Sequence, residues 1–349
     1  MLRRPSPLRP ATTRLRSVVR FLLPLIVVPA VFAQIAKAPG VPDSSLVWPQ
    51  APERARIRHV QTVASLENLE VSRGFFSKVL SIFGGEEQRK LQLVQPVGIG
   101  VMRDGRLLIA DPGANGVHVI DLKEHKYEFL AGPKDGSFAS PVGIAVDNAG
   151  NVYISDSQRG YVCAFDPGLD FRFAVNEHLE RPTGLATSGG RLYVADAARH
   201  AVVMFDLQGH YAGEFGKRGG GAGEFNFPVG IAARRDSLMV VDALNYRVQE
   251  FDSTGHFLSA FGAQGNVAGR FAGPKGIAFD SDGDAYVTDA LMDNIQIFNP
   301  SGTLLLIVGS SGSRDGDFSS PGGIAVGPDD RIYVVETFNR RVQIFQYLK

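Results

Sequence analysis

A Pro-x-Gly tripeptide followed by a short apolar run recurs six times in this chain of 349 residues. The six copies are Pro96–Gly98, Pro141–Gly143, Pro182–Gly184, Pro228–Gly230, Pro274–Gly276 and Pro321–Gly323, and successive copies are separated by 45, 41, 46, 46 and 47 residues. A period of this size, with turn residues and alternating strands inside each unit, is typical of repeated small β-sheets. The repeats account for residue 96 to the C-terminus, so we expect one large closed domain there.

Each repeat is predicted to contain four strands. The fourth copy shows them most clearly, at residues 230–233, 238–241, 247–251 and 256–261, separated by turns rich in Asp, Asn, Ser and Gly. The period-2 alternation and the turn residues follow the rules for antiparallel hairpins. Six such sheets predict an all-β, six-bladed β-propeller of four-stranded antiparallel blades, starting near residues 96, 141, 182, 228, 274 and 321.

The size of the side chains changes along each repeat. Small residues stand two apart on the first strand, from Gly143 and Ala145 to Gly323 and Ala325. Phenylalanines recur on the third strand, as Phe165, Phe205, Phe251, Phe298 and Phe345. Radially arranged sheets crowd together at the axis and diverge outward, so this gradient predicts how the blades pack.

The sixth repeat lacks a fourth strand, because the chain ends at Lys349 soon after its third predicted strand. Residues 55–65 alternate polar and apolar side chains, and we expect them to form a closing strand that removes the open sheet edge. Residues 66–95 then form an insert before the first blade, and Phe75–Phe83, followed by Gly84 and Gly85, predicts a short amphipathic helix there. That helix either packs on the propeller or docks a partner or a membrane through Phe75, Phe76, Leu80 and Phe83.

The first 33 residues resemble a secretory signal peptide. Six arginines and no acid precede an apolar stretch from Phe21 to Ala33 that ends in small residues. The stretch is shorter than the roughly 20 residues needed to span a bilayer. We therefore expect export to the periplasm or the extracellular space, with residues 34–54 as a linker. An uncleaved N-terminal membrane anchor is the alternative.

The charge balance and the cysteine content limit the classes of partner. The 36 basic residues equal the 36 acidic ones, so loss of the six N-terminal arginines would leave an acidic protein. We expect no nucleic-acid partner, and membrane contact only through the N-terminal segment or the 75–83 helix. The single cysteine, Cys163, cannot form an intrachain disulfide.

The motif Pro-x-Gly-Ile-Ala-Val, then Tyr-Val-x-Asp, then Asn-x-Arg-Val-Gln-x-Phe, resembles the NHL repeat. The fourth copy fits best, with Asp242, Asn245, Arg247, Val248, Gln249 and Phe251, and the sixth has Glu336 in place of the aspartate. The resemblance covers about residues 96 to 349. It implies a protein- or ligand-binding module, and it leaves open a metal-dependent lactonase or hydrolase, or an amidating lyase, at the channel mouth. The fold alone does not establish any of these activities.

One acid in each repeat follows the second predicted strand. These residues are Asp111, Asp156, Asp196, Asp242, Asp289 and Glu336. A ring of carboxylates would suit a cation, but one acid per repeat is better explained as a structural hydrogen-bond acceptor for loop amides or a partner for Arg247 and Arg341. We could assemble no three-histidine zinc site and no convergent carboxylates on the first strands, so we predict no metal and no cofactor.

The remaining function is a non-enzymatic scaffold that binds a protein or a small ligand in the cell envelope through its loop-rich face. Residues that depart from the repeat, or carry charge on its loops, are the candidates for binding. They are Arg159, Tyr161, Arg199, His200, Arg247, Asp293, Asn294 and Arg341.

Overall fold

The computed structural model describes residues 46–64, 92–133, 136–234 and 236–349. The chain divides into two units, residues 1–39 and 40–349, and all of the described residues belong to the second unit. The segments predicted as a signal peptide and as the Phe75–Phe83 helix lie outside the described residues. None of the helices that the structure describes is long and apolar enough to cross a membrane.

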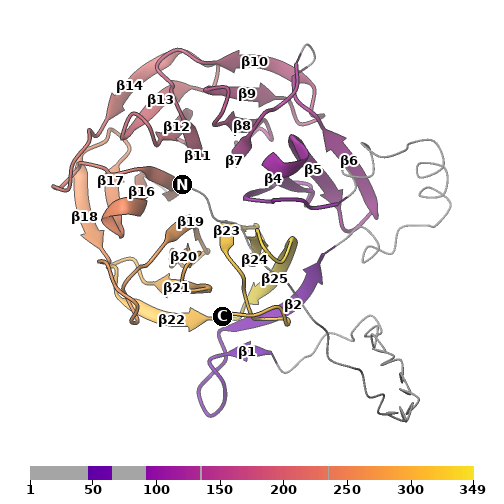
Figure 1. Ribbon diagram of the computed structural model, residues 1–349, viewed down its shortest axis with the longest axis vertical. Coiled ribbons are helices and arrows are strands. Elements are labelled where there is room, and N and C mark those ends of the chain that lie inside the picture. The colour runs from indigo at the N-terminus through magenta and orange to yellow at the C-terminus, as the bar shows by residue number, and fades with distance from the viewer. Residues whose placement is uncertain (1–45, 65–91, 134–135, 235) are drawn as a thin grey trace, which may run out of the picture. The chain divides into compact units, whose positions relative to one another are not determined.

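The second unit is the predicted six-bladed propeller of four-stranded antiparallel sheets (Figure 1). Blade 1 contains β3 (Gly98–Val101), β4 (Leu107–Asp111), β5 (Gly116–Asp121) and β6 (Lys126–Leu130). Blade 2 contains β7 (Pro141–Val146), β8 (Val152–Asp156), β9 (Tyr161–Phe165) and β10 (Phe171–Val175). Blade 3 contains β11 (Pro182–Ser188), β12 (Arg191–Asp196), β13 (Ala201–Asp206) and β14 (Tyr211–Phe215).

Blade 4 contains β15 (Pro228–Arg234), β16 (Ser237–Asp242), β17 (Arg247–Asp252) and β18 (Phe257–Phe261). Blade 5 contains β19 (Pro274–Phe279), β20 (Ala285–Asp289), β21 (Asn294–Phe298) and β22 (Leu304–Val308). Blade 6 contains β23 (Pro321–Val326), β24 (Arg331–Glu336) and β25 (Arg341–Tyr347), followed in space by β2 (Ile57–Val63) and β1 (Val47–Trp48). Two short 3-10 helices, η3 (Pro112–Ala114) and η4 (Ala243–Asn245), follow β4 and β16.

The N-terminal strand closes the ring as the sequence predicted. β2 pairs antiparallel with β25, and the register runs from Ile57 opposite Tyr347 to Val63 opposite Val342. The structure adds β1, which pairs with β2 inside the stretch expected to be a linker. The closing sheet therefore has five strands instead of four. Sequence reasoning missed β1 because two residues are too few to show an alternating pattern.

The first strands of the six blades surround the axis, and each contacts the first strand of both neighbouring blades. A glycine at the Pro-x-Gly position makes each contact possible. A Cβ built on Gly98, Gly143, Gly184, Gly230, Gly276 or Gly323 would lie closer than 3.0 Å to the carbonyl oxygen of the x residue in the next blade. Further from the axis, the five third-strand phenylalanines fill the wider space between the blades as predicted, since each is about 1% exposed.

Replacing Gly143 by Ala should destabilise the propeller strongly. The added methyl group would overlap the carbonyl oxygen of Thr183, and neither backbone can move without shifting a whole blade. We expect the free energy of unfolding to fall by about 2–3 kcal/mol, measured by urea denaturation. Gly220→Ala is the matched control, because nothing lies within 4 Å of that site. Equal stability of the two variants would contradict this account of ring closure.

The closing strand buries a histidine against the last blade. His59 is 4% exposed, its Nε2 lies 3.0 Å from Thr62 Oγ1, and its ring meets that of Phe345 edge-on. Its Nδ1 has no hydrogen-bond partner in the described part of the chain. Burial lowers the pKa of His59, and the positive charge of Arg341 lowers it further, while Asp315 opposes the shift.

The folded state should therefore lose stability as the pH falls. Below about pH 6.5 the unfolded chain protonates this histidine while the folded chain does not, and the loss continues down to the depressed folded-state pKa. We expect the free energy of unfolding to be lower at pH 5.5 than at pH 7.5, and His59→Phe to reduce this difference. His210→Phe, at an exposed histidine, should leave the difference unchanged. An identical pH profile for His59→Phe and the unaltered protein would argue against the effect.

Candidate functional site

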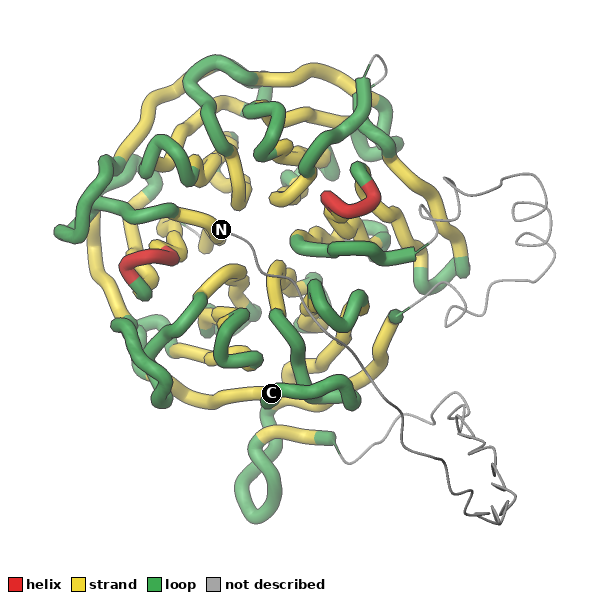
Figure 2. Tube along the Cα trace, in the orientation of Figure 1, coloured by secondary structure: helices red, strands yellow, loops and turns green. Residues whose placement is uncertain are grey.

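Two sets of connections meet on one side of the propeller, which we call the loop face. The loop before each first strand lies beside the turn between the second and third strands of the same blade. In blade 2, for example, the carboxylate of Asp156 at the end of β8 accepts hydrogen bonds from Ala139 and Ser140, which precede β7. The 3-10 helices η3 and η4 occupy two of these turns (Figure 2).

The acid in each repeat is a buried structural acceptor. Asp196 is typical: it accepts hydrogen bonds from the amides of Glu180 and Arg181 on one loop and of Ala198 and Arg199 on the other. All six acids are fully buried, and each binds at least one amide of the loop before the first strand. The structural explanation of these acids is therefore confirmed.

The acid of blade 1 also takes part in a buried histidine contact. His118 Nε2 lies 3.3 Å from Asp111 Oδ2, and Nδ1 lies 3.0 Å from Tyr127 Oη. His118 holds the position that Gln249 and Gln343 hold in blades 4 and 6. Burial alone would raise the pKa of Asp111, but the hydrogen bonds from His118 and the loop amides outweigh it and hold the pKa low. Among the residues that the structure describes, no three His, Cys, Asp or Glu side chains form a metal-ligand group.

Two of the arginines predicted to bind a partner make hydrogen bonds within their own blades. Arg247 contacts Asp242 at 2.9 Å and donates to the carbonyl oxygens of Gly221 and Glu224. Arg341 is 6% exposed, pairs with Glu336 and donates to the carbonyl oxygens of the loop before β23. These contacts tie the loop before the first strand to the acid of the same blade, so both arginines have a structural role in the fold.

Four further candidates are also committed to the fold. Arg199 pairs with Glu214 at 2.6 Å, and the carboxylate of Asp293 accepts from the amide of Ser320. His200 is buried and accepts from the amide of Phe227, and Asn294 is buried at the position that arginine occupies in blades 4 and 6. Arg199, His200 and Asp293 break the repeat and make local contacts that the sequence alone did not reveal, whereas Asn294 Oδ1 is buried without a hydrogen-bond partner among the described residues.

Arg159 and Tyr161 remain at the surface of blade 2, where Arg159 is exposed and Tyr161 is half-buried. Burial raises the pKa of Tyr161, so its hydroxyl stays protonated at neutral pH. The eight predicted residues are distributed over blades 2 to 6. The docking residues Phe75, Phe76, Leu80 and Phe83 lie outside the described residues.

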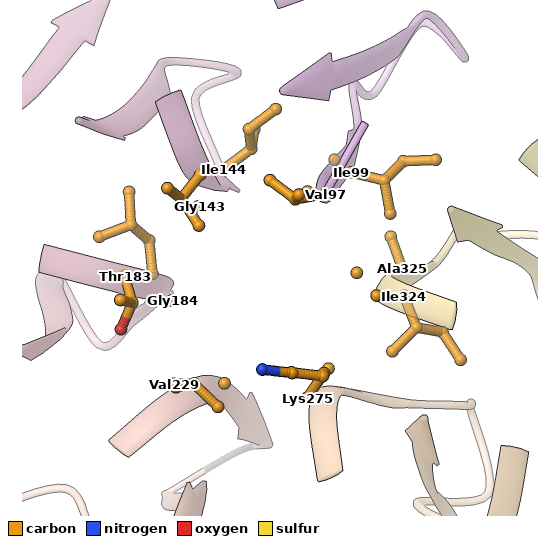
Figure 3. Close-up of a pocket in the computed structure, with 18 of the residues that line it drawn as sticks. Val97, Ile99, Gly143, Ile144, Thr183, Gly184, Val229, Lys275, Ile324 and Ala325 are labelled. Atoms are coloured by element: carbon orange, nitrogen blue, oxygen red, sulfur yellow. The ribbon is translucent and has the colours of Figure 1, made fainter. Parts of the chain in front are cut away.

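The hollow that the structure does form is the central channel, with a volume of about 940 Å³. Its wall is built from the first strands and from the loop-face turns, and consists largely of Gly, Ala, Val and Ile. Figure 3 shows Val97 and Lys275 directed into the channel, whereas Ile99 and Ile324 point between the blades. Ile99 and Ile324 accordingly belong to the buried cores.

Lys275 is the one charged residue at the x position of the six Pro-x-Gly motifs, where the other blades have Val97, Val142, Thr183, Val229 and Gly322. Its side chain is exposed, and the wall also includes the exposed Arg181 at the mouth. No Asp, Glu or His lines the described part of the channel. Comparing the x positions across the repeats would have identified Lys275 from the sequence.

The loop face carries a large exposed apolar side chain in each of blades 4 to 6. Leu244, Leu291 and Phe338 occupy the same repeat position, two residues after the acid, and are 49%, 75% and 76% exposed. Val267, in the loop before β19, is 58% exposed. The same repeat position in blades 1 to 3 holds Gly113, Gln158 and Ala198. We call Leu244, Leu291 and Phe338 the apolar arc.

Removing one of the structural carboxylates should unfold the loop face. Asp196→Ala would leave four loop amides without their acceptor, including that of Arg181 at the channel mouth. We expect the free energy of unfolding to fall by about 3 kcal/mol, with no recovery on adding divalent metal ions. Asp170→Ala, at an exposed acid, should change it by less than about 0.5 kcal/mol. Rescue by a metal ion would mean that the acids bind cations after all.

Comparisons with known proteins agree with this architecture. Residues 176–260 match a family model described as a 6-bladed beta-propeller, and residues 318–345 match the NHL repeat. NHL-repeat-containing protein 4 from Homo sapiens is 29% identical over 116 residues, which are 33% of this chain and 94% of that protein.

Solved structures also align with most of the chain. A streptogramin B lyase aligns with a TM-score of 0.57 at 14% identity, covering 73% of this chain and 94% of that one. Virginiamycin B lyase from Staphylococcus aureus aligns with a TM-score of 0.53 at 16% identity, covering 74% and 96%. At these identities the likeness concerns the fold alone. With the repeat motifs and the six observed blades, these matches show a six-bladed β-propeller with an NHL repeat in its last blade.

Proposed function

We propose that this chain is an exported, non-enzymatic binding protein that docks a protein partner of the cell envelope on its loop face. The observation that carries the proposal is the apolar arc. Leucine or phenylalanine at these exposed positions contributes little to packing, and blades 1 to 3 hold Gly, Gln and Ala there without loss of the fold. Exposed large apolar side chains grouped on one face are typical of protein-binding surfaces.

The rest of the loop face supports binding rather than catalysis. Its acids and several of its irregular polar residues already hydrogen-bond to loop amides and carbonyls, which leaves few side chains for proton transfer. Rigid loops that present apolar side chains suit recognition. The lyases among the solved structures share this fold, and a fold hosts unrelated functions. An enzyme at the channel mouth is the alternative, and the apolar arc does not favour it.

Export is supported by the N-terminal sequence, in which six arginines precede a short apolar stretch ending at Ala33. Secretion places the loop face in contact with envelope proteins. The mature protein would begin near residue 34. Mass spectrometry of the protein recovered from the envelope fraction tests this part of the proposal, because an uncleaved anchor would retain residues 1–33.

Substituting the arc should abolish partner binding without unfolding the propeller. We expect the double variant Leu244→Ser, Leu291→Ser to weaken binding by about 30-fold, which corresponds to a loss of about 1 kcal/mol of binding free energy at each leucine. The measurement is quantitative recovery of partners from envelope extract by the immobilised full-length protein, followed by titration of the recovered partner.

The matched control is Leu258→Ser, Leu305→Ser, which removes two leucines that are 53% and 40% exposed on outer strands. This control should bind as the unaltered protein does. Equal recovery by both double variants would refute the arc as the docking surface. Bound metal together with turnover of a lactone or peptide substrate would favour the enzymatic alternative.

A further inference from the structure

The central channel is a second place where this propeller could hold a ligand. Its volume of about 940 Å³ falls within the range of small-molecule sites, at roughly 300–1,000 Å³. Its wall is mainly apolar and is formed by small residues, including Ala145, Ala186, Ala232, Ala278 and Ala325 on successive blades. A wall of this kind accommodates an unbranched apolar chain and offers it few hydrogen-bond partners.

Lys275 places one positive charge in this apolar wall. Its ammonium group extends into the open channel (Figure 3). Within the described ranges, no carboxylate lies within 4.0 Å of it, although most other arginines and lysines of the loop face pair with acids or carbonyls. Packing does not require a lysine here, because five blades close the ring with Val, Thr or Gly.

The two charged side chains that line the described part of the channel, Lys275 and Arg181, are both positive. Arg181 lines the mouth as a second cation, and no acid occurs among the channel-lining residues that the structure describes. The hydroxyl of Thr183 is already used, because it donates to the carbonyl oxygens of Ala195 and Pro228. A low-dielectric channel that carries charge of one sign concentrates ions of the opposite sign. The channel therefore favours an anion.

The chemistry of the mouth also selects among anions. A phosphate presents several oxygens and is usually bound by clusters of backbone N–H groups. At this mouth the loop amides that could form such a cluster donate to the buried acids, as those of Gln95, Ser140 and Gly273 do. The ammonium group of Lys275 can pair with a carboxylate through charge-assisted hydrogen bonds without such a cluster of amides.

We propose that the channel binds a carboxylate carried on an apolar chain, with Lys275 paired to the carboxylate at the loop-face end and the apolar chain against the Gly, Ala and Val wall. Either a free fatty acid or the apolar C-terminal tail of a protein supplies this chemistry. The proposal goes beyond partner docking by the apolar arc and does not depend on it. Of the arc residues, Phe338 also lines the channel, whereas Leu244 and Leu291 do not, so the two leucines test the arc separately.

Calorimetric titration of the full chain with decanoate tests the proposal. Lys275→Met should weaken binding by about 10- to 100-fold, because it removes a charge-assisted hydrogen bond and leaves the size of the side chain nearly unchanged. Lys275→Arg should restore most of the affinity. Val229→Met is the matched control, because it alters the neighbouring wall at the equivalent x position without changing the charge.

Four further titrations define the ligand. Decanol should bind at least 10-fold more weakly than decanoate, and decyl phosphate should not bind more tightly. A peptide with an apolar, free C-terminus should bind better than its amidated form if a protein tail is the ligand, whereas a preference for decanoate over that peptide identifies a fatty acid. Either preference supports the proposal.

Four outcomes would overturn the proposal. Decanol could bind as tightly as decanoate, or Lys275→Met could leave the affinity for decanoate unchanged. Decyl phosphate could bind more tightly than decanoate, or neither decanoate nor the free-acid peptide could bind. The Leu244→Ser, Leu291→Ser variant should bind decanoate normally. Failure of the arc proposal and failure of the channel proposal are thus observed separately.

Discussion

The close approach of each first-strand glycine to the carbonyl oxygen of the next blade determines the geometry of the ring. Six such contacts, from Gly98 against Val142 round to Gly323 against Val97, set the distance between blades at the axis. Hydroxyl groups satisfy some of the carbonyl oxygens at these contacts: Ser155 donates to Thr183 and Thr288 donates to Gly322. The side chains outside the axis then fill wedges whose width this contact has fixed.

The regular parts of the molecule were predictable because they recur. Six copies of Pro-x-Gly, the third-strand phenylalanines and the alternating residues 55–65 each reflect a packing need that every blade shares, and the structure confirms the propeller and its closing strand. The strand β1 escaped prediction because two residues cannot display a period. The structural role of the acids was also predictable, since one acid per repeat implies one local task per repeat.

The candidate binding residues were predicted poorly, for a physical reason. Charged residues such as Arg341 and Arg199 looked available in sequence, but their partners come from other segments of the blade and occupy them. The departures from the repeat that point to a binding site are those residues for which the fold supplies no partner. Lys275 stands among aliphatic residues at the axis, and Leu291 and Phe338 stand in solvent. A residue that departs from the repeat indicates function only when no packing contact or hydrogen bond within the fold explains it.

The five-stranded sheet has a consequence for how the chain is made. Its strand β2 is synthesised before any blade, but its partner β25 ends two residues before the C-terminus. Until β25 has been synthesised, the edge of β2 that it covers has no neighbour, and the sheet stays incomplete. Unpaired strand edges recruit foreign strands and promote aggregation. The growing polypeptide therefore depends on protection of the free β2 edge until β25 has emerged.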